Sequence, residues 1–140
     1  MIDIRYVEMK DKEFWFSLDR HLSDEEFEKK ARDKQGYVMT KNDKPIGILR
    51  YHLFWDNTPF CTLLYISSDF QRNGYGSMLM RHWEDQMKAK GYSFVLTSTQ
   101  VDENAQYFYR KLGYQDCGGL LLKSQPMELF MLKEFVNEDM

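Results

Sequence analysis

The sequence has few cysteines and no long apolar segment. Its two cysteines, Cys61 and Cys117, stand alone, which indicates neither a disulfide framework nor a zinc site, and we expect both to be reduced thiols. A membrane-spanning helix needs about 18 or more consecutive apolar residues, and no such run occurs. The first residues also lack the basic-then-apolar order of a signal peptide. We therefore expect a cytoplasmic protein with no membrane partner.

An excess of one charge is also missing. The net charge is −3, and acidic and basic residues are interspersed along the chain. Nucleic-acid binding needs clustered lysine and arginine to neutralise phosphates, so we expect no nucleic-acid partner. The three histidines have no metal-ligand spacing, and we predict no metal site. Small or basic partners remain possible.

The chain has the size of one domain and ample material for a core. It contains 140 residues, of which 43% are hydrophobic and 16% aromatic. No internal repeat, low-complexity tract or linker interrupts it. We expect one domain over residues 1–140, acting as a monomer or a homodimer.

The hydrophobic pattern predicts an alternation of strands and helices. Ser23 and Glu26 have the spacing of a helix capping box, and Met78, Leu79, Trp83 and Met87 are expected on one helical stripe. The order is βααβββαβαββ, which predicts a mixed α/β sheet with helices on both faces. The expected strands are 2–7, 37–40, 46–54, 60–66, 94–99, 120–122 and 129–132, and the expected helical regions are 11–33, 77–90 and 103–112.

The stretch Gln71-Arg72-Asn73-Gly74-Tyr75-Gly76 follows an apolar strand and precedes an amphipathic helix. Such a turn leaves backbone N–H groups unpaired at the positive end of the helix dipole, which makes an anion seat. The alternative is a tight strand-to-helix connection that binds nothing. A P-loop or a Rossmann loop is excluded, because there is no Gly-Lys-Ser/Thr and Leu79 stands where a third glycine would be needed.

A second motif, Phe108-Tyr109-Arg110-Lys111-Leu112-Gly113-Tyr114, lies about thirty residues after the turn. Together with Gln-x-x-Gly-x-Gly behind a strand, it resembles the GNAT superfamily of acetyl-CoA-dependent N-acetyltransferases. The resemblance covers most of the chain and is weakest over the first forty residues or so. It implies a mostly antiparallel, twisted sheet of six to seven strands with helices on both faces.

The resemblance also implies where acetyl-CoA binds. Gln71 opens the pyrophosphate loop, and Gly74 and Gly76 match the two glycines of the family. The backbone N–H groups of residues 72–77 (Arg72, Asn73, Gly74, Tyr75, Gly76 and Ser77) would then hold the pyrophosphate. The pantetheine arm would pair with the main chain of Leu64, Tyr65 and Ile66.

The tyrosine motif implies a general acid. Tyr109 matches the tyrosine that many members place near the coenzyme sulfur to protonate the departing thiolate, whereas Tyr107 and Phe108 are expected to pack the helix on the sheet. Members commonly have asparagine seven residues before this tyrosine, where this chain has Asp102. An ionised carboxylate cannot donate a hydrogen bond. Asp102 is therefore expected either to contact coenzyme A or to cap the helix, with Asn104 taking over the contact.

The general base is less clearly marked. The strand before the loop offers Phe60, Cys61 and Thr62, none of which is a natural base. His52 on the preceding strand is the nearest titratable candidate, and it could also be a packed or solvent-facing strand residue. Further candidates are Glu84, Asp69 and a chain of waters.

The expected activity is transfer of an acetyl group from acetyl-CoA to a primary amine of a small molecule or peptide, by direct attack. The alternatives are a non-catalytic acyl-CoA-binding or regulatory module, and an acyltransferase partner that acts only in a complex. An aromatic acceptor pocket would suit a cationic amine through cation–π contact, but its candidate residues could equally form core and edge packing. These residues are Trp15, Phe16, Tyr51, Phe54 and Trp55.

Overall fold

A computed structural model describes residues 1–136, with four α-helices and seven strands in this part of the chain. The strands are β1 (Ile2–Tyr6), β2 (Gly36–Lys41), β3 (Lys44–Phe54), β4 (Thr58–Ile66), β5 (Phe94–Gln100), β6 (Gln115–Leu120) and β7 (Glu128–Glu134). The helices are α1 (Lys12–Leu18), α2 (Asp24–Asp33), α3 (Tyr75–Ala89) and α4 (Ala105–Lys111), with 3-10 turns η1 (Met9–Asp11) and η2 (Ser68–Phe70). Residues 137–140 of the expected domain lie outside the described residues.

The strands are hydrogen-bonded in the order β1-β2-β3-β4-β5-β7-β6. The pairs β1–β2, β2–β3, β5–β7 and β6–β7 are antiparallel, and β4 pairs with β5 in parallel. The predicted mixed sheet of mostly antiparallel strands is confirmed. The chain divides into two compact units, Met1–His52 with Thr62–Trp83 (unit 1) and Leu53–Cys61 with Glu84–Met140 (unit 2).

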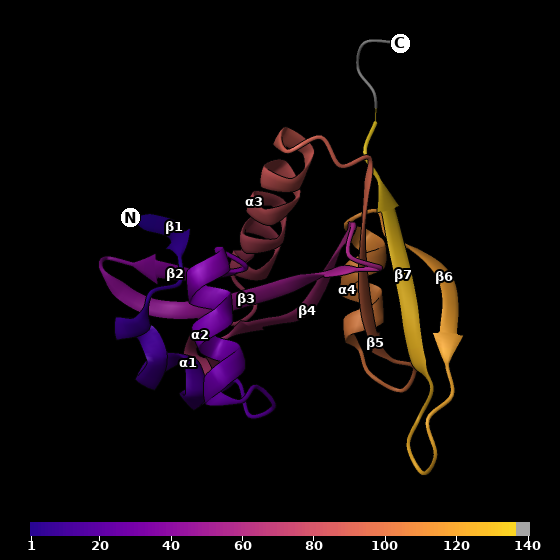
Figure 1. Ribbon diagram of the computed structural model, residues 1–140, viewed down its shortest axis with the longest axis horizontal. Coiled ribbons are helices and arrows are strands. Elements are labelled where there is room, and N and C mark those ends of the chain that lie inside the picture. The colour runs from indigo at the N-terminus through magenta and orange to yellow at the C-terminus, as the bar shows by residue number, and fades with distance from the viewer. Residues whose placement is uncertain (137–140) are drawn as a thin grey trace. The chain divides into compact units, whose positions relative to one another are not determined.

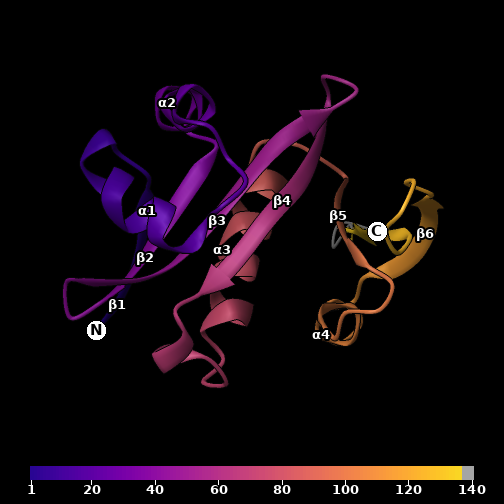
Figure 2. The same ribbon diagram turned by 90° about the horizontal axis from the view of Figure 1, so that it is seen from below.

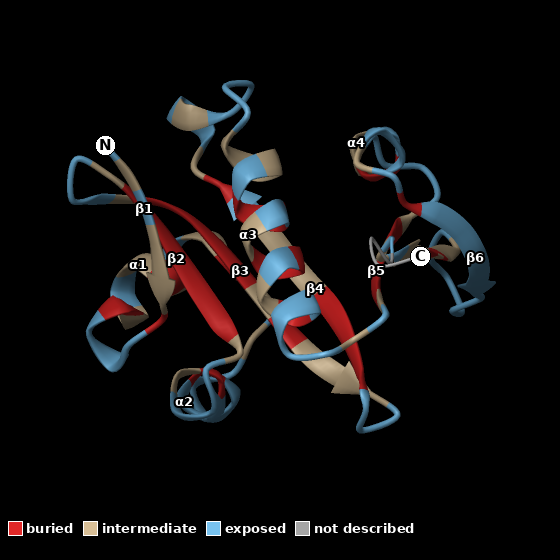
Figure 3. Ribbon diagram, turned by 90° about the horizontal axis from the view of Figure 1, so that it is seen from above, coloured by how far each residue is buried: buried red, intermediate tan, exposed pale blue. Residues whose placement is uncertain are grey.

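In unit 1, helices cover both faces of β2 and β3. Trp15 of α1 and Phe27 of α2 are fully buried against Val38 and Ile48 on one face, where Figures 1 and 2 show both helices. On the other face, side chains of α3 meet the alternate strand residues, with His82 against Tyr37 and Trp83 against Tyr51. Because both faces are covered, β2 is buried from Gly36 to Thr40 (Figure 3).

Local sequence explains where the elements of unit 1 begin and end. The Ser23 hydroxyl accepts the N–H of Glu26 at 3.1 Å, which caps α2 as predicted, and Lys34 ends this helix in a left-handed conformation. Asn42 and Asp43 both have positive φ, as the tight hairpin turn between β2 and β3 requires.

Unit 2 contains β5, β7 and β6 with α4. Tyr109 and Tyr114 are buried in this unit, and their rings contact each other at 5.6 Å. Gly113 follows α4 with φ of +100°, which is the predicted helix C-cap. At the edge of the sheet, β6 is exposed along its whole length.

Two sequence predictions were wrong in detail. Met78 is exposed and Met80 is buried, because Met78 lies about 140° around the helix from Trp83, so the buried stripe of α3 is Leu79, Met80, Trp83 and Met87. The strand expected over 120–122 is β6, Gln115–Leu120. An exposed edge strand pairs through its backbone and needs no apolar run, so its polar and glycine residues gave no strand signal.

Candidate functional site

The loop between β4 and α3 is held in shape by its own side chains. The Gln71 amide Nε2 donates to the carbonyl of Ile66 at 2.8 Å, and the Asn73 amide Nδ2 donates to the carbonyls of Phe70 and Gln71 at 3.2 and 3.1 Å. Both side chains therefore satisfy backbone carbonyls of the turn. Gln71 and Asn73 thus build the loop, a role that its motif does not reveal.

The N–H groups of this loop are left without acceptors. The first hydrogen bond of α3 runs from the N–H of Met78 to the carbonyl of Gly74 at 3.1 Å. Within residues 1–136, the N–H groups of Arg72, Asn73, Gly74, Tyr75, Gly76 and Ser77 donate no hydrogen bond. Six consecutive unpaired donors at the positive end of a helix are groups that an anion can satisfy.

The backbone of the loop needs left-handed conformations at two positions. Gly74 has φ of +81°, and no heavy atom lies within 4 Å of the place where a Cβ would stand. Arg72 adopts φ of +65° despite its side chain. The space over Gly74 is open, so a ligand can approach this backbone closely.

Two lysines that the motif did not predict add positive charge beside the loop. The Lys41 Nζ lies 5.4 Å from the centre of the Tyr75 ring, and the Lys44 Nζ lies 5.3 Å from that of Phe70. They flank the turn between β2 and β3, about thirty residues before the loop in the sequence. No local sequence pattern links these lysines to the loop. They lie near it only because of the fold of unit 1.

The end of β4 carries the residues expected to meet the pantetheine arm. Tyr65 is exposed, whereas Ile66 is buried and its carbonyl already accepts the Gln71 amide. A Cβ at Gly47 would lie 2.5 Å from the Ile66 Cδ1 and 3.3 Å from the Tyr65 carbonyl oxygen, so a side chain here would displace Ile66 and crowd the main chain of β4. The main chain of Leu64 and Tyr65 is therefore more available to a ligand than that of Ile66.

Tyr109 lies in unit 2, on α4, and is 7% exposed. Burial raises the pKa of its hydroxyl above the ordinary value, Cys61 and Glu103 raise it further, and a hydrogen bond with Thr97 lowers it. The hydroxyl is therefore protonated throughout the neutral pH range and can act as a donor. Tyr107 was expected to pack on the sheet, but it is 57% exposed and lies under the Arg110 guanidinium, so that prediction was wrong.

The residues before α4 also differ from expectation. Asn104, and not Asp102, is the N-cap of α4, and its side chain makes no capping hydrogen bond. The Gln106 amide instead donates to the carbonyls of Val101 and Glu103 at 2.7 and 2.9 Å. The capping role predicted for Asp102 is therefore wrong, and the side chains of Asp102 and Asn104 are exposed at the surface of unit 2.

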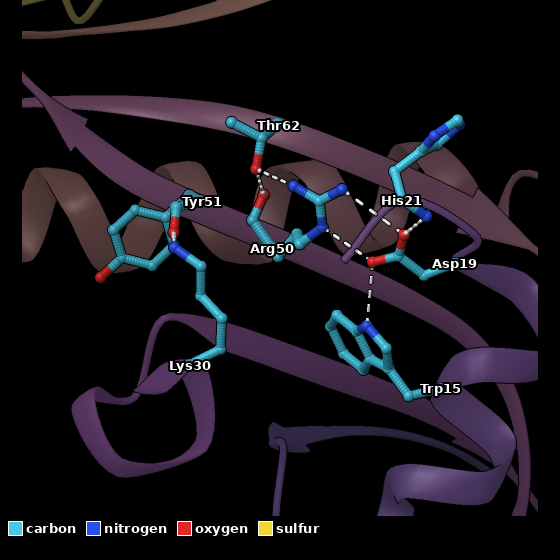
Figure 4. A network of polar contacts seen from close by, with 7 residues as sticks. All are labelled: Trp15, Asp19, His21, Lys30, Arg50, Tyr51 and Thr62. Atoms are coloured by element: carbon cyan, nitrogen blue, oxygen red, sulfur yellow. Dashed lines mark hydrogen bonds and ion pairs between the residues drawn. The ribbon is translucent and has the colours of Figure 1, made fainter. Parts of the chain in front are cut away.

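His52 lies at the end of the unit 1 part of β3. Burial lowers the pKa of its imidazole below the ordinary value of 6.5, and the charges of Lys30 and Arg50 lower it further. Lys30 is fixed beside β3 by a 2.6 Å hydrogen bond to the Tyr51 carbonyl (Figure 4). His52 is therefore neutral at pH 7, the form that accepts a proton.

Arg50 links α1 and the segment after it to β3 and β4 (Figure 4). Its Nε donates to the Asp19 carboxylate at 2.8 Å, and its Nη1 donates to the Thr62 hydroxyl at 2.9 Å. The same carboxylate accepts the Trp15 Nε1 at 3.0 Å and the His21 N–H at 3.1 Å. Trp15 is thus a core residue and not part of a pocket wall.

The other aromatic candidates also pack against neighbouring rings. Phe16 contacts Phe27 at 5.5 Å, Tyr51 contacts Trp83 at 5.8 Å, and Phe54 contacts Phe60 at 5.9 Å. Trp55 is 77% exposed at the turn after β3. Packing therefore describes all of these residues, and the exposed Trp55 is edge packing, with its ring 4.6 Å from that of Phe54.

The remaining titratable candidates divide into buried and exposed groups. The Glu84 carboxylate is buried in unit 2, where it accepts the Tyr114 hydroxyl at 2.8 Å and the Lys133 Nζ at 2.7 Å. It is engaged in these contacts and is a poor candidate for the base. Asp69 is exposed in η2.

Three further sequence expectations concern the cysteines, metal ions and membrane-spanning helices. Neither Cys61 nor Cys117 forms a disulfide within residues 1–136. In the described residues, no three histidine, cysteine or acidic side chains are grouped to hold a metal ion. Among the helices of the same residues, none is both long enough and apolar enough to cross a bilayer.

The comparison with protein families places this fold among the acyltransferases. The Acetyltransferase (GNAT) family matches residues 3–114, so the chain belongs to this family and the resemblance seen in the sequence is confirmed. No curated protein matches the sequence.

Solved structures share this fold at low sequence identity. Ard1 from Thermoplasma volcanium aligns with a TM-score of 0.86 at 18% identity, over 97% of this chain and 99% of its own. The ribosomal-protein-S18-alanine N-acetyltransferase from Escherichia coli gives a TM-score of 0.80 at 17% identity, over 100% of this chain and 99% of its own. Arabidopsis thaliana Naa50, in complex with the bisubstrate analogue CoA-Ac-MVNAL, gives a TM-score of 0.79 at 16% identity, over 96% of this chain and 99% of its own.

Proposed function

We propose that this protein is an N-acetyltransferase that moves the acetyl group of acetyl-CoA to a primary amine by direct attack. The observation that carries the proposal is the row of six unpaired N–H groups at the start of α3, in a chain of the acetyltransferase family. Cys61 and Cys117 are not needed as nucleophiles in this scheme. The single domain proposed here is formed by both units.

The loop is proposed to hold the pyrophosphate of coenzyme A. A hydrogen bond to a charged group contributes about 1.5–3 kcal/mol, so three or four of the N–H groups of residues 72–77 would supply much of the affinity. Lys41 and Lys44 add positive charge on the same side of unit 1. The main chain of Leu64 and Tyr65 is proposed to pair with the pantetheine arm.

Tyr109 is proposed as the general acid. The amine nitrogen attacks the thioester carbonyl carbon, the C–S bond breaks, and the bonding pair leaves on sulfur. The Tyr109 hydroxyl gives its proton to this thiolate and later regains one from solvent. The hydroxyl carries its proton at neutral pH, as a general acid must, although burial and the raised pKa also make it a weaker acid than an ordinary tyrosine.

His52 is proposed to take the proton from the attacking nitrogen, directly or through water. Its lowered pKa keeps it neutral at pH 7, but it also makes His52 a weak base. An alkyl ammonium has a pKa near 10.4, so presenting the neutral amine at pH 7 costs about 4.6 kcal/mol. A peptide α-amine, with a pKa of about 7.7–8.0, costs only about 1 kcal/mol.

This difference favours a peptide α-amine as the acceptor over a lysine side chain or a simple alkylamine. Two of the structural neighbours point in the same direction. The E. coli enzyme is named for an alanine of a ribosomal protein, and the ligand of Naa50 joins coenzyme A to a peptide.

The test is release of free thiol from acetyl-CoA with three matched acceptors. These are a peptide with a free α-amine and no lysine, the same peptide with a blocked N-terminus and one lysine, and a diaminoalkane. We expect turnover with the first and at least tenfold less with the others. Equal or greater turnover with either of the others would overturn the choice of acceptor.

Two further measurements test the enzyme assignment itself. Calorimetry should detect binding of acetyl-CoA, and binding without turnover on any acceptor would identify a non-catalytic module instead. Tyr109→Phe should lower kcat about 10²–10⁴-fold. The exposed neighbour Tyr107 supplies the matched control, because Tyr107→Phe removes the same hydroxyl from the same helix and should leave kcat unchanged.

A further inference from the structure

Glu128, the first residue of β7, is a partly buried acidic residue that has no basic partner in the described residues. Four acidic side chains of these residues are not exposed, namely Asp11, Asp19, Glu84 and Glu128. The first three bind an arginine or a lysine at 2.7, 2.8 and 2.7 Å. No ion pair within residues 1–136 includes Glu128. Because a charge removed from water needs a partner, a cation from outside the chain can bind here.

One hydrogen bond holds the carboxylate of Glu128 in place. The Ser98 hydroxyl of β5 donates to the Glu128 Oε2 at 2.7 Å, the length of a hydrogen bond to an ionised oxygen. Within residues 1–136 the Glu128 side chain accepts no other hydrogen bond. A carboxylate has two oxygens with about four acceptor sites, so Oε1 remains available to a ligand.

Ser98 lies where the pairing of β4 with β5 ends. The last pair of these two parallel strands is Cys61 with Thr97, and Ser98 is the next residue of β5. The carboxylate that Ser98 holds is therefore fixed at the point in unit 2 where β5 is no longer paired with β4.

Apolar side chains lie beside this carboxylate. Glu128 is paired with Leu120 of β6, and Phe130 follows two residues along β7, so all three side chains point to the same face of the sheet. Leu120 is 47% exposed, and Leu121 and Leu122 after it are 82% and 42% exposed. A carboxylate beside exposed leucines suits a cation that is attached to an apolar group.

We propose that Glu128 binds the amino group of the acceptor, and that the acceptor is a peptide whose apolar first side chain lies on Leu120. The inference rests on the proposed function, in which a peptide α-amine attacks acetyl-CoA. Charge complementarity supports this choice, because a peptide N-terminus carries its cation directly beside its first side chain. A carboxylate accepts an N–H from both the ammonium ion and the neutral amine, so the amine keeps its lone pair for the attack.

The experiment measures binding of two peptides to enzyme saturated with coenzyme A, which has no acetyl group to transfer. One is a lysine-free pentapeptide that begins with leucine and has a free α-amine, and the other is the same peptide with an acetylated N-terminus. By calorimetry, wild type should bind the free peptide at least about tenfold more tightly, as expected for a hydrogen bond between charged groups. Equal affinity for the two peptides would overturn the inference.

Glu128→Gln tests the residue itself, because an amide keeps the shape of the side chain and can still accept from Ser98. This variant should bind the two peptides within about threefold of each other. The matched control is Glu134→Gln, which removes the same charge from the exposed other end of β7 and should keep the wild-type preference. A tenfold preference that persists in Glu128→Gln would overturn the inference. Circular dichroism reports whether this variant folds, and if it does not, the preference of wild type decides alone.

Kinetics separate this inference from the proposed function. Glu128→Gln should raise KM for the free peptide about 10- to 100-fold and leave KM for acetyl-CoA within about twofold of wild type. Thiol release by wild type with an unchanged peptide KM in Glu128→Gln would keep the activity and overturn the role of Glu128. A tenfold preference for the free peptide without thiol release on any acceptor would overturn the activity and support the amine site.

Discussion

At the scale of single residues, a substitution at Gly74 has two separate effects. It destabilises the left-handed backbone, and it places a Cβ where the ligand is expected to approach. The Gly74 φ of +81° disfavours any side chain, while the space around a new Cβ is empty. Gly91, which follows the other end of α3, has φ of +96° and equally empty surroundings. The two glycines therefore differ in their proximity to the loop and not in strain.

We predict that Gly74→Ala and Gly91→Ala each lower the free energy of unfolding by about 1–2 kcal/mol, the cost of a left-handed alanine. Only Gly74→Ala should weaken binding of acetyl-CoA, by tenfold or more, because its Cβ meets the phosphate oxygens. Urea unfolding and calorimetric titration measure the two effects. Equal coenzyme affinity in both variants would contradict the assignment of the loop.

His52 gives a prediction for the pH dependence of the reaction. Because the pKa of its imidazole is lowered, it loses its proton below the ordinary value of 6.5 and stays neutral above it. If it is the base, kcat/KM for the acceptor at saturating acetyl-CoA falls in two steps as the pH is lowered, first near the pKa of the α-amine, about 7.7–8.0, and again below pH 6.5 as His52 takes up its proton. The measurement is a pH profile of wild type and His52→Gln. A lower step that is unchanged in His52→Gln would assign that step to another group.

At the scale of elements, the Asp19–Arg50 pair fixes the segment after α1 against β3 and β4. Asp19 has a fully buried side chain that accepts four hydrogen bonds from Trp15, His21 and Arg50. Removing one partner of a buried pair leaves an uncompensated charge, which typically costs 3–5 kcal/mol, whereas replacing both by apolar residues is often close to neutral.

We predict that Asp19→Ala lowers the free energy of unfolding by about 3–5 kcal/mol, and that adding Arg50→Met recovers part of this loss.

The pKa of Asp19 lies below the ordinary 3.8, although burial alone would raise it, because the hydrogen bonds from Arg50 and His21 favour the carboxylate. Its contribution is therefore complete well above pH 3.8 and is lost as the pH falls through the lower folded value. Urea unfolding from pH 7 to 3 should show the difference between wild type and Asp19→Ala shrinking only at the acid end. A constant difference would indicate that the carboxylate charge is not involved.

The elements themselves were largely predictable where local rules decide them. The capped start of α2 at Ser23, the turn at Asn42 and the C-cap at Gly113 follow from residue types that favour these conformations. The sequence misplaced the strand at β6 because an exposed edge strand carries no hydrophobic alternation. It also misjudged Tyr107, since periodicity places a residue on a helix face but does not say which face the sheet covers.

At the scale of the whole molecule, three elements run through both compact units. β3 passes from unit 1 to unit 2 after His52, β4 passes from unit 2 to unit 1 after Cys61, and α3 passes from unit 1 to unit 2 after Trp83. Neither unit is therefore made of whole strands and helices alone. We therefore expect them to unfold together.

We predict one cooperative thermal transition, with equal calorimetric and van't Hoff enthalpies, and an increase in stability of about 2.7 kcal/mol at an acetyl-CoA concentration 100 times its Kd. Scanning calorimetry with and without the coenzyme measures both. Two resolved transitions would contradict the single domain proposed for this chain.

The sequence by itself determined the family, the order of the elements and the glycine-bearing turn between β4 and α3, because each depends on residues that lie close together along the chain. Only the tertiary structure decided which side chains surround them. Lys41 and Lys44 lie beside the loop, burial together with Lys30 and Arg50 lowers the pKa of His52, and Thr97 donates to the Cys61 carbonyl, all through contacts between distant segments. Such contacts depend on strand pairing and helix packing, which leave no periodic or local signal in a single sequence.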